Sequence, residues 1–144
     1  MPSDETADDL VLDTHVWYWL VNGDAQLAGS PAWPRIEQAC RSGRVALSAI
    51  SLWEICMLEE KQRIRLQLDR LEWLRRGLDL TSTRLIALSP EIAAESTRLP
   101  GKLHNDPADR IIVASARSLG WTLATRDQKL LDYAASGFVR AIRV

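Results

Sequence analysis

Acidic side chains stand at the ends of several short apolar segments in this sequence. Asp13 directly follows the apolar segment 10–12, and Asp127 follows the segment 121–125. Glu54 and Asp109 lie within predicted helices. Carboxylates gathered in one pocket raise each other's pKa values unless a hard divalent cation such as Mg²⁺ or Mn²⁺ neutralises them. Such a cation can activate water and stabilise displacement at phosphorus without a histidine. The candidate chemistry is therefore metal-assisted hydrolysis of a phosphate ester.

Glu54 has the most unusual surroundings of these acids, because nearly all of its neighbours in the segment 50–58 are apolar. An ionised carboxylate in an apolar environment is costly unless a cation or hydrogen bonds compensate for the lost water. The alternative is an exposed glutamate on the outer face of the helix, accompanied by Glu59 and Lys61. We favour the functional interpretation.

The other acids have structural alternatives at helix starts. Asp13 and Asp127 could each cap the helix that follows. Asp109 occupies the third position of its predicted helix, where a negative charge favours the helix dipole. Asp106 precedes Pro107, so we predict that Asp106 is the N-cap and only supports the site from behind. Asp109 is then the better candidate for chemistry in this segment.

The elements that must position these acids alternate along the chain. Strands are predicted at 10–12, 45–47, 84–88, 121–125 and 138–142, and helices at 14–21, 49–61, 66–78, 90–100, 107–119 and 128–134. Short apolar strands alternating with helices indicate an α/β fold, with a central, mainly parallel sheet covered on both faces. Because sites in such sheets form beyond the carboxyl ends of the strands, Asp13 and Asp127 are expected at the same edge.

The overall composition is that of one globular domain. The chain has 144 residues, 47% of them hydrophobic, and a formal net charge of −1, which gives no general attraction to nucleic acid. No apolar run reaches the roughly 20 residues that span a bilayer. Residues 1–9 are acidic and polar, and we expect a flexible tail followed by a single domain over 10–144. We therefore expect a cytoplasmic protein. Cys40 and Cys56 form neither a disulfide framework nor a zinc-binding spacing.

Four segments together resemble the ordered motifs of a known family. They are Leu12-Asp13-Thr14-His15, Ser48-Ala49-Ile50-Ser51-Leu52-Trp53-Glu54-Ile55, His104-Asn105-Asp106-Pro107-Ala108-Asp109-Arg110 and Thr125-Arg126-Asp127. The sequence resembles PIN domains, and in particular the VapC-type toxins of bacterial toxin–antitoxin pairs. Each motif alone is unspecific, but four in this order cover nearly the whole chain after residue 9.

This resemblance implies a three-layer α/β/α sandwich and an Mg²⁺- or Mn²⁺-dependent endoribonuclease. The family's acidic core falls on Asp13, Glu54 and Asp109. Asp127 matches a fourth position that varies within the family, and Thr125 matches a small hydroxyl residue near the metal. The resemblance further implies an RNA substrate, a homodimer and an antitoxin that blocks the active site. Residues 1–9 depart from the family's usual start, where the first strand begins almost at once.

Two arginines adjoin the motif acids. Arg110 and Arg126 could contact substrate phosphates, or could instead pair with the neighbouring carboxylates. RNA hydrolysis by this site would leave a 5′-phosphate and a 3′-hydroxyl.

The tryptophans give a weaker indication of binding surfaces. Trp17, Trp19, Trp53, Trp73 and Trp121 fall in predicted helices or strands, and we expect most of them in the core or an interface. Trp17 and Trp19 are two residues apart and cannot share one helical face, so one of them is a candidate for a dimer or antitoxin surface. Base stacking by an exposed tryptophan ranks below packing.

Other functional classes remain open. A catalytically silent PIN fold that only binds RNA or protein is one, although the retained acids argue against it. A receiver-type phosphoacceptor domain would need a lysine at a strand end, where neither Lys102 nor Lys129 falls. A haloacid-dehalogenase-like phosphatase would need a second aspartate two residues after Asp13, where His15 stands instead.

Overall fold

A computed structural model describes residues 8–144. Its centre is a five-stranded, all-parallel sheet with the strand order β3-β2-β1-β4-β5. The strands are β1 (Leu10–Leu12), β2 (Val45–Ser48), β3 (Arg84–Ile86), β4 (Thr122–Thr125) and β5 (Ala141–Arg143). The helices are α2 (Thr14–Asn22), α3 (Ala25–Ala28), α4 (Trp33–Arg41), α5 (Ala49–Glu60), α6 (Arg70–Thr81), α7 (Pro90–Ser96), α8 (Pro107–Leu119) and α9 (Gln128–Ala135).

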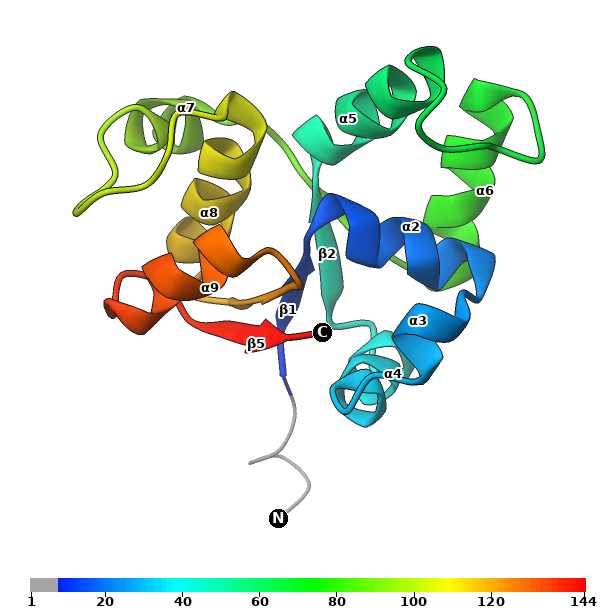
Figure 1. The fold of residues 1–144 in the computed structure, drawn as a ribbon, viewed down its shortest axis with the longest axis horizontal. Helices are drawn as coiled ribbons and strands as arrows, with labels where there is room; N and C mark the ends of the chain where they lie inside the picture. Colours follow the sequence, from blue (N-terminus) through cyan, green and yellow to red (C-terminus); the bar gives the residue numbers. More distant parts are fainter. Residues whose placement is uncertain (1–7) are drawn as a thin grey trace.

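Helices cover both faces of this sheet, which confirms the predicted three-layer α/β/α arrangement (Figure 1). Helices α7, α8 and α9 lie on one side, and α2, α3, α4 and α6 lie on the other. Side chains of β1 alternate between the two layers: Leu10 and Leu12 belong to one buried cluster and Val11 belongs to the other. This alternation follows from the two-residue period of a strand, and it explains why a strand buried on both faces is continuously apolar.

The strand order also bears on the alternative folds. A receiver-type domain has the order 2-1-3-4-5, whereas this sheet is ordered 3-2-1-4-5. The chain therefore does not have the receiver topology. The order reverses between β1 and β4, and the carboxyl ends of these neighbouring strands are where an open α/β sheet forms its ligand site.

The structure differs from the sequence-based expectation in the stretch 24–44, at helix ends and in two strands: β3 ends at Ile86 rather than near residue 88, and β5 begins at Ala141 rather than near residue 138. Helices α3 and α4 were not predicted, although Pro34 in the first turn of α4 is a typical start signal. Helix α6 begins at Arg70 rather than near residue 66. Helix α7 ends at Ser96, before the predicted end near residue 100. At this end the hydroxyls of Ser96 and Thr97 donate to the carbonyl oxygens of Ala93 and Ala94.

The chain is already anchored just before β1. Asp8 accepts two hydrogen bonds from Arg35, at 2.8 and 2.9 Å, and the amide of Thr122 donates to the carbonyl oxygen of Asp9. The remainder of the expected tail, residues 1–7, lies outside the described residues. Among residues 8–144 there is no helix with both the length and the apolar character needed to cross a bilayer.

Candidate active site

The site begins at the junction of β1 and β4. Asp13 directly follows β1 and caps α2, where its Oδ1 accepts from the amide of Thr14 at 2.9 Å. Its other oxygen accepts a 2.6 Å hydrogen bond from the hydroxyl of Thr125, the last residue of β4. The two carboxylate oxygens of Asp13 are therefore held by the start of α2 and by the end of β4, at the point where the sheet order reverses. Burial raises the pKa of Asp13, and the hydrogen bonds from Thr125 and Thr14 partly offset this effect.

Glu54 reaches the same region from α5. The hydroxyl of Thr14, the residue after Asp13, donates to Oε1 of Glu54 and also lies 2.9 Å from the Oγ of buried Ser51. A threonine hydroxyl has one proton, so Thr14 donates it to the carboxylate and can accept the proton of Ser51. Burial raises the pKa of Glu54, opposed by the Thr14 hydrogen bond. Glu54 is partly buried and faces the other acids rather than the outer surface of the helix, and its functional role stays a prediction.

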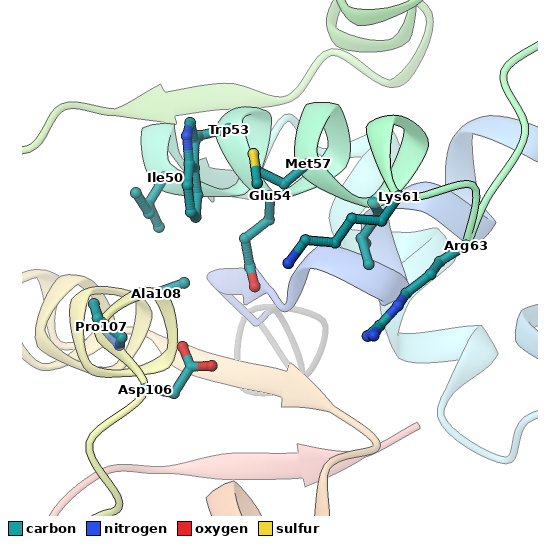
Figure 2. A pocket seen from close by; sticks show the side chains of 10 residues that line it. Ile50, Trp53, Glu54, Met57, Lys61, Arg63, Asp106, Pro107 and Ala108 are labelled. Atoms are coloured by element: carbon teal, nitrogen blue, oxygen red, sulfur yellow. The ribbon is translucent and has the colours of Figure 1, made fainter.

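The amino end of α8 brings two further acids. Asp106 is the N-cap, and its Oδ1 accepts from the amide of Asp109 at 3.0 Å, as the position before Pro107 predicts. Its carboxylate also faces the site: one oxygen from each of Glu54, Asp106 and Asp109 lies within 4.8 Å of the others. Figure 2 shows the carboxylates of Glu54 and Asp106 pointing toward one another from α5 and α8. Asp106 therefore belongs to the acidic cluster itself, and not only to the support behind it.

Mutual repulsion is strongest at Asp109. Burial, and then the charges of Asp13, Asp106 and Glu54, raise the pKa of Asp109 to about 8. Near neutral pH this carboxyl group therefore holds a proton for much of the time when nothing neutralises its neighbours. The cluster is an arrangement of acids that only a positive charge can make favourable in fully ionised form.

His104, the first residue of the third motif, is a neighbour of the cluster. Its Nδ1 accepts from the amide of Asp106 at 3.3 Å, so the proton of the neutral ring resides on Nε2. Nε2 is buried and lies 3.1 Å from Oδ2 of Asp109, without the alignment of a hydrogen bond. The positive edge of the imidazole thus faces the most strongly perturbed carboxyl group of the site.

Asp127 lies at the periphery. It caps α9 by accepting from the amide of Lys129 at 2.8 Å, while its own amide donates to the Thr125 hydroxyl at 3.0 Å. Its charge contributes to the raised pKa values of Asp13 and Asp109, so it is close enough to act on both electrostatically. It is not among the three acids whose oxygens converge, and its role as a ligand stays a prediction.

The two neighbouring arginines have other partners than those considered from the sequence. Arg110 donates to the carbonyl oxygens of Ser96, Leu103 and His104, and so holds the loop before α8. Arg126 stacks over the ring of Trp19, 4.5 Å from its centroid, and donates to the side chain and carbonyl of Gln26 and to the carbonyl of Val144. Neither forms an ion pair with the adjacent acids within the described part of the chain. Both guanidinium groups are thus engaged in holding the backbone.

The donor atoms of the cluster suit a hard divalent cation. They are carboxylate oxygens, which are the preferred ligands of Mg²⁺ and Mn²⁺. Burial, and after it the charges of neighbouring acids, raise the pKa values of Asp109, Asp13 and Glu54, so a positive charge among these carboxylates would favour their ionised forms. The residues present therefore fit the metal that the sequence motifs imply, and this fit rests on their geometry and charge.

Comparisons with known proteins agree with this geometry. The family model described as "PIN domain" matches residues 10–136. Ribonuclease VapC22 of Mycobacterium tuberculosis is 36% identical over 124 residues, which are 86% of this chain and 91% of that protein.

Solved structures share the fold at lower sequence identity. VapBC2 from Rickettsia felis, bound to a DNA fragment from its promoter, has a TM-score of 0.66 and 15% identity, with 93% of this chain and 97% of that chain covered. VapBC from Salmonella typhimurium, also bound to DNA, has a TM-score of 0.65 and 17% identity, with 94% and 97% covered. Because the family model spans most of the sequence and a close relative spans nearly all of it, the chain belongs to the PIN-domain family.

Proposed function

We propose that this protein is a metal-dependent endoribonuclease that hydrolyses phosphodiester bonds in RNA, and that it is the toxin of a toxin–antitoxin pair. The observation that carries the proposal is the convergence of Glu54, Asp106 and Asp109 beside Asp13, at the edge where the strand order reverses. The 36% identical relative named a ribonuclease supports the choice of RNA as substrate.

Each acid has a defined task in this proposal. Asp13, Glu54, Asp106 and Asp109 would hold Mg²⁺ or Mn²⁺, and Asp127 would add negative charge at the rim. The bound ion would lower the pKa of a water molecule and neutralise charge at the scissile phosphate. Thr125 and Thr14 fix the carboxylates of Asp13 and Glu54 by hydrogen bonds, so that these oxygens need little reorganisation.

The proposal is tested by cleavage of a mixed RNA population with Mg²⁺, with Mn²⁺ and with EDTA, using the native protein and Asp13→Asn. We expect product strands with 5′-phosphate ends in the presence of metal, and a loss of at least a hundredfold in rate with EDTA or Asp13→Asn. Activity that survives both treatments would exclude the metal mechanism. Calorimetric titration with Mn²⁺ separates a nuclease from a silent PIN fold, which should bind the ion poorly.

The partners of the protein are part of the same proposal. The solved neighbours include a member of the VapBC family of toxin-antitoxin systems from Mycobacterium tuberculosis, with a TM-score of 0.56 and 22% identity. A cognate antitoxin that covers the acidic cluster and a homodimer of this chain are therefore proposed. Exposed leucines on α6 and at β3, Leu71, Leu80 and Leu85, offer apolar surface for self-association. Light scattering of the purified chain tests the dimer, and co-purification with the product of an adjoining small gene tests the antitoxin.

A further inference from the structure

A hollow of about 480 Å³ adjoins the acidic cluster between α5 and α8. Its wall on α5 is formed by residues spaced three and four apart, which places them on one helical face: Ile50, Trp53, Glu54, Met57, Leu58 and Lys61. An adjacent face of α5 carries buried Ser51 and Ile55 and faces the core. Helix α5 is therefore apolar on two sides, of which one packs and the other lines an open hollow.

The hollow has a distinct chemistry at each part. Glu54 and Asp106 bring the acidic cluster to the middle of the hollow, with Lys61 and Arg63 on one side of Glu54 and Trp53 on the other (Figure 2). The side chain of Trp53 is 56% exposed although it is one of the largest apolar groups of the chain. Trp53 is therefore not a core residue, and of the two expected locations for the tryptophans only an interface is left for it.

The backbone turn after α5 positions Arg63, the second cation of the hollow. The amides of Gln62 and Arg63 donate to the carbonyl oxygens of Glu59 and Leu58, and Gln62 has a φ of +58°. This is the turn that usually ends a helix with glycine, and a residue with a Cβ pays about 1 kcal/mol for the left-handed conformation. The turn reverses the chain so that Arg63 comes back to line the hollow.

The two cations are free to bind an anion from solution. Among residues 8–144, no carboxylate forms an ion pair with Lys61 or Arg63, whereas nearby Arg70 is engaged by Glu59 and Glu60. Lys61 follows Glu54 by seven residues, so their backbone positions are about 10 Å apart along the helix axis. Figure 2 shows the amine of Lys61 pointing back toward Glu54 and the guanidinium of Arg63 farther from the acidic cluster. An anion at Arg63 can therefore be a different group from the one held at the cluster.

We propose that this hollow is a nucleotide subsite for single-stranded RNA, next to the scissile phosphate. A base would stack against Trp53, and a phosphate one or two nucleotides from the scissile bond would contact Lys61 and Arg63. The inference rests on the proposed ribonuclease function and narrows its substrate to strands whose bases are unpaired. A base held in a duplex is stacked between its neighbours and cannot reach the indole without being extruded.

Charge and position favour RNA over a protein helix as the occupant. An apolar helix would use the aromatic wall, but it would leave Lys61 and Arg63 without the phosphates that their position suits. The hollow is also continuous with the cluster, since Glu54 and Asp106 belong to both. A polynucleotide that is cut at the cluster must extend from it in both directions, and the hollow offers a stacking surface at Trp53 on one side of Glu54 and positive charge at Lys61 and Arg63 on the other (Figure 2).

The test measures binding of a fluorescein-labelled single-stranded RNA decamer of mixed sequence, and of the same decamer annealed to its complement, by anisotropy in EDTA. Trp53→Ala should raise the Kd for the single strand by about fivefold to a hundredfold, and Trp53→Phe should recover most of the loss. The duplex should bind more weakly than the single strand to the native protein and should be little affected by either change.

The cations are tested through salt dependence. The double variant Lys61→Ala/Arg63→Ala should reduce the slope of log Kd against log salt concentration by about 1.4, which corresponds to two phosphate contacts on a single strand. Arg41→Ala/Arg44→Ala removes the same charge at the opposite end of β2, and Leu119→Ala removes an exposed apolar side chain at the far end of α8. Both controls should leave the slope and the Kd unchanged.

The outcomes separate this inference from the proposed function. If the Trp53 and Lys61/Arg63 variants bind the decamer like the native protein, the subsite is wrong, whatever Asp13→Asn does to cleavage. Equal affinity of the native protein for single strand and duplex would also overturn it. Unchanged RNA binding together with weakened binding of a co-expressed antitoxin would assign the hollow to the protein partner instead. Loss of cleavage in Asp13→Asn, by contrast, tests only the metal mechanism.

Discussion

The hydroxyl of Thr125 donates a 2.6 Å hydrogen bond to Oδ2 of Asp13, across 112 residues of sequence. Thr125 is fully buried at the end of β4, and the same hydroxyl accepts from the amide of Asp127. The side chain of Thr125 thus connects the end of β4 to Asp13, which follows the neighbouring strand β1, and to Asp127 at the start of α9. A valine has the same shape but can satisfy neither partner.

Thr125→Val should therefore weaken metal binding more than it perturbs the fold. Loss of a residue that orients a ligand carboxylate typically costs 10- to 100-fold in metal affinity, and we expect a loss of this order for Mn²⁺ by calorimetry. The unsatisfied Asp127 amide should cost about 1–3 kcal/mol of unfolding free energy in denaturant titration. Thr125→Ser keeps the hydroxyl and should bind Mn²⁺ nearly as well as the native protein. Equal affinities for the valine and serine variants would contradict the orienting role.

Thr14 holds Glu54 in the same manner from α2. Thr14→Val removes the hydrogen bond to Glu54 and leaves Ser51 without its partner inside the α2–α5 contact. We expect the rate of RNA cleavage at saturating substrate to fall by about tenfold or more, with little change in KM. The reason is that the freed Glu54 carboxylate acts at the acidic cluster and does not bind the remainder of the RNA. Ser51→Ala breaks only the buried hydroxyl pair and serves as the control. A change confined to KM would argue that Thr14 contacts substrate instead.

Much of this arrangement could be predicted from the sequence, because it depends on local rules. A fully apolar three-residue strand followed by Asp13, and Asp106 before Pro107, correctly predicted a parallel strand and a helix cap. The membership of Asp106 in the cluster was missed, because a capping role explained the residue and gave no reason to seek a second one. Trp53 was missed for a related reason: an apolar helix does not reveal which of its faces the rest of the chain leaves uncovered. The roles of Arg110 and Arg126 depend on backbone carbonyls that only the folded loops bring to the guanidinium groups, so the motif residues next to each arginine could not indicate them.

The acidic cluster should make the stability of the metal-free protein depend on pH. The pKa of Asp109 is about 8 in the folded chain and 3.8 for an ordinary aspartate, so the folded state binds more protons between these values. Stability should therefore be highest at acid pH and should fall as the pH rises from about 4 to 8. The raised pKa values of Asp13 and Glu54 act in the same direction. Thermal unfolding in EDTA at several pH values measures this trend.

Asp109→Asn provides the matched comparison for that pH profile. It removes the most strongly perturbed acid and should flatten the fall in Tm between pH 5 and 8. A saturating concentration of Mg²⁺ should stabilise the native protein more at pH 8 than at pH 5, since the ion competes with protons for the carboxylates. A metal-free protein whose Tm rises steadily over this range would show that the acids do not repel one another as described.

Arg110 gives a prediction that separates substrate binding from folding. Its guanidinium donates to three backbone carbonyls, of Ser96, Leu103 and His104, and so fixes the loop that leads to the Asp106 cap. Arg110→Lys keeps the charge but cannot reproduce this geometry, so it should lower the unfolding free energy by about 1–3 kcal/mol. If Arg110 instead served mainly to bind substrate phosphate, lysine would preserve stability and alter chiefly the KM for RNA. Denaturant titration and steady-state cleavage of one RNA decide between these outcomes. A loop-holding role predicts a lower denaturant midpoint of unfolding and a nearly unchanged KM under conditions where the variant is folded.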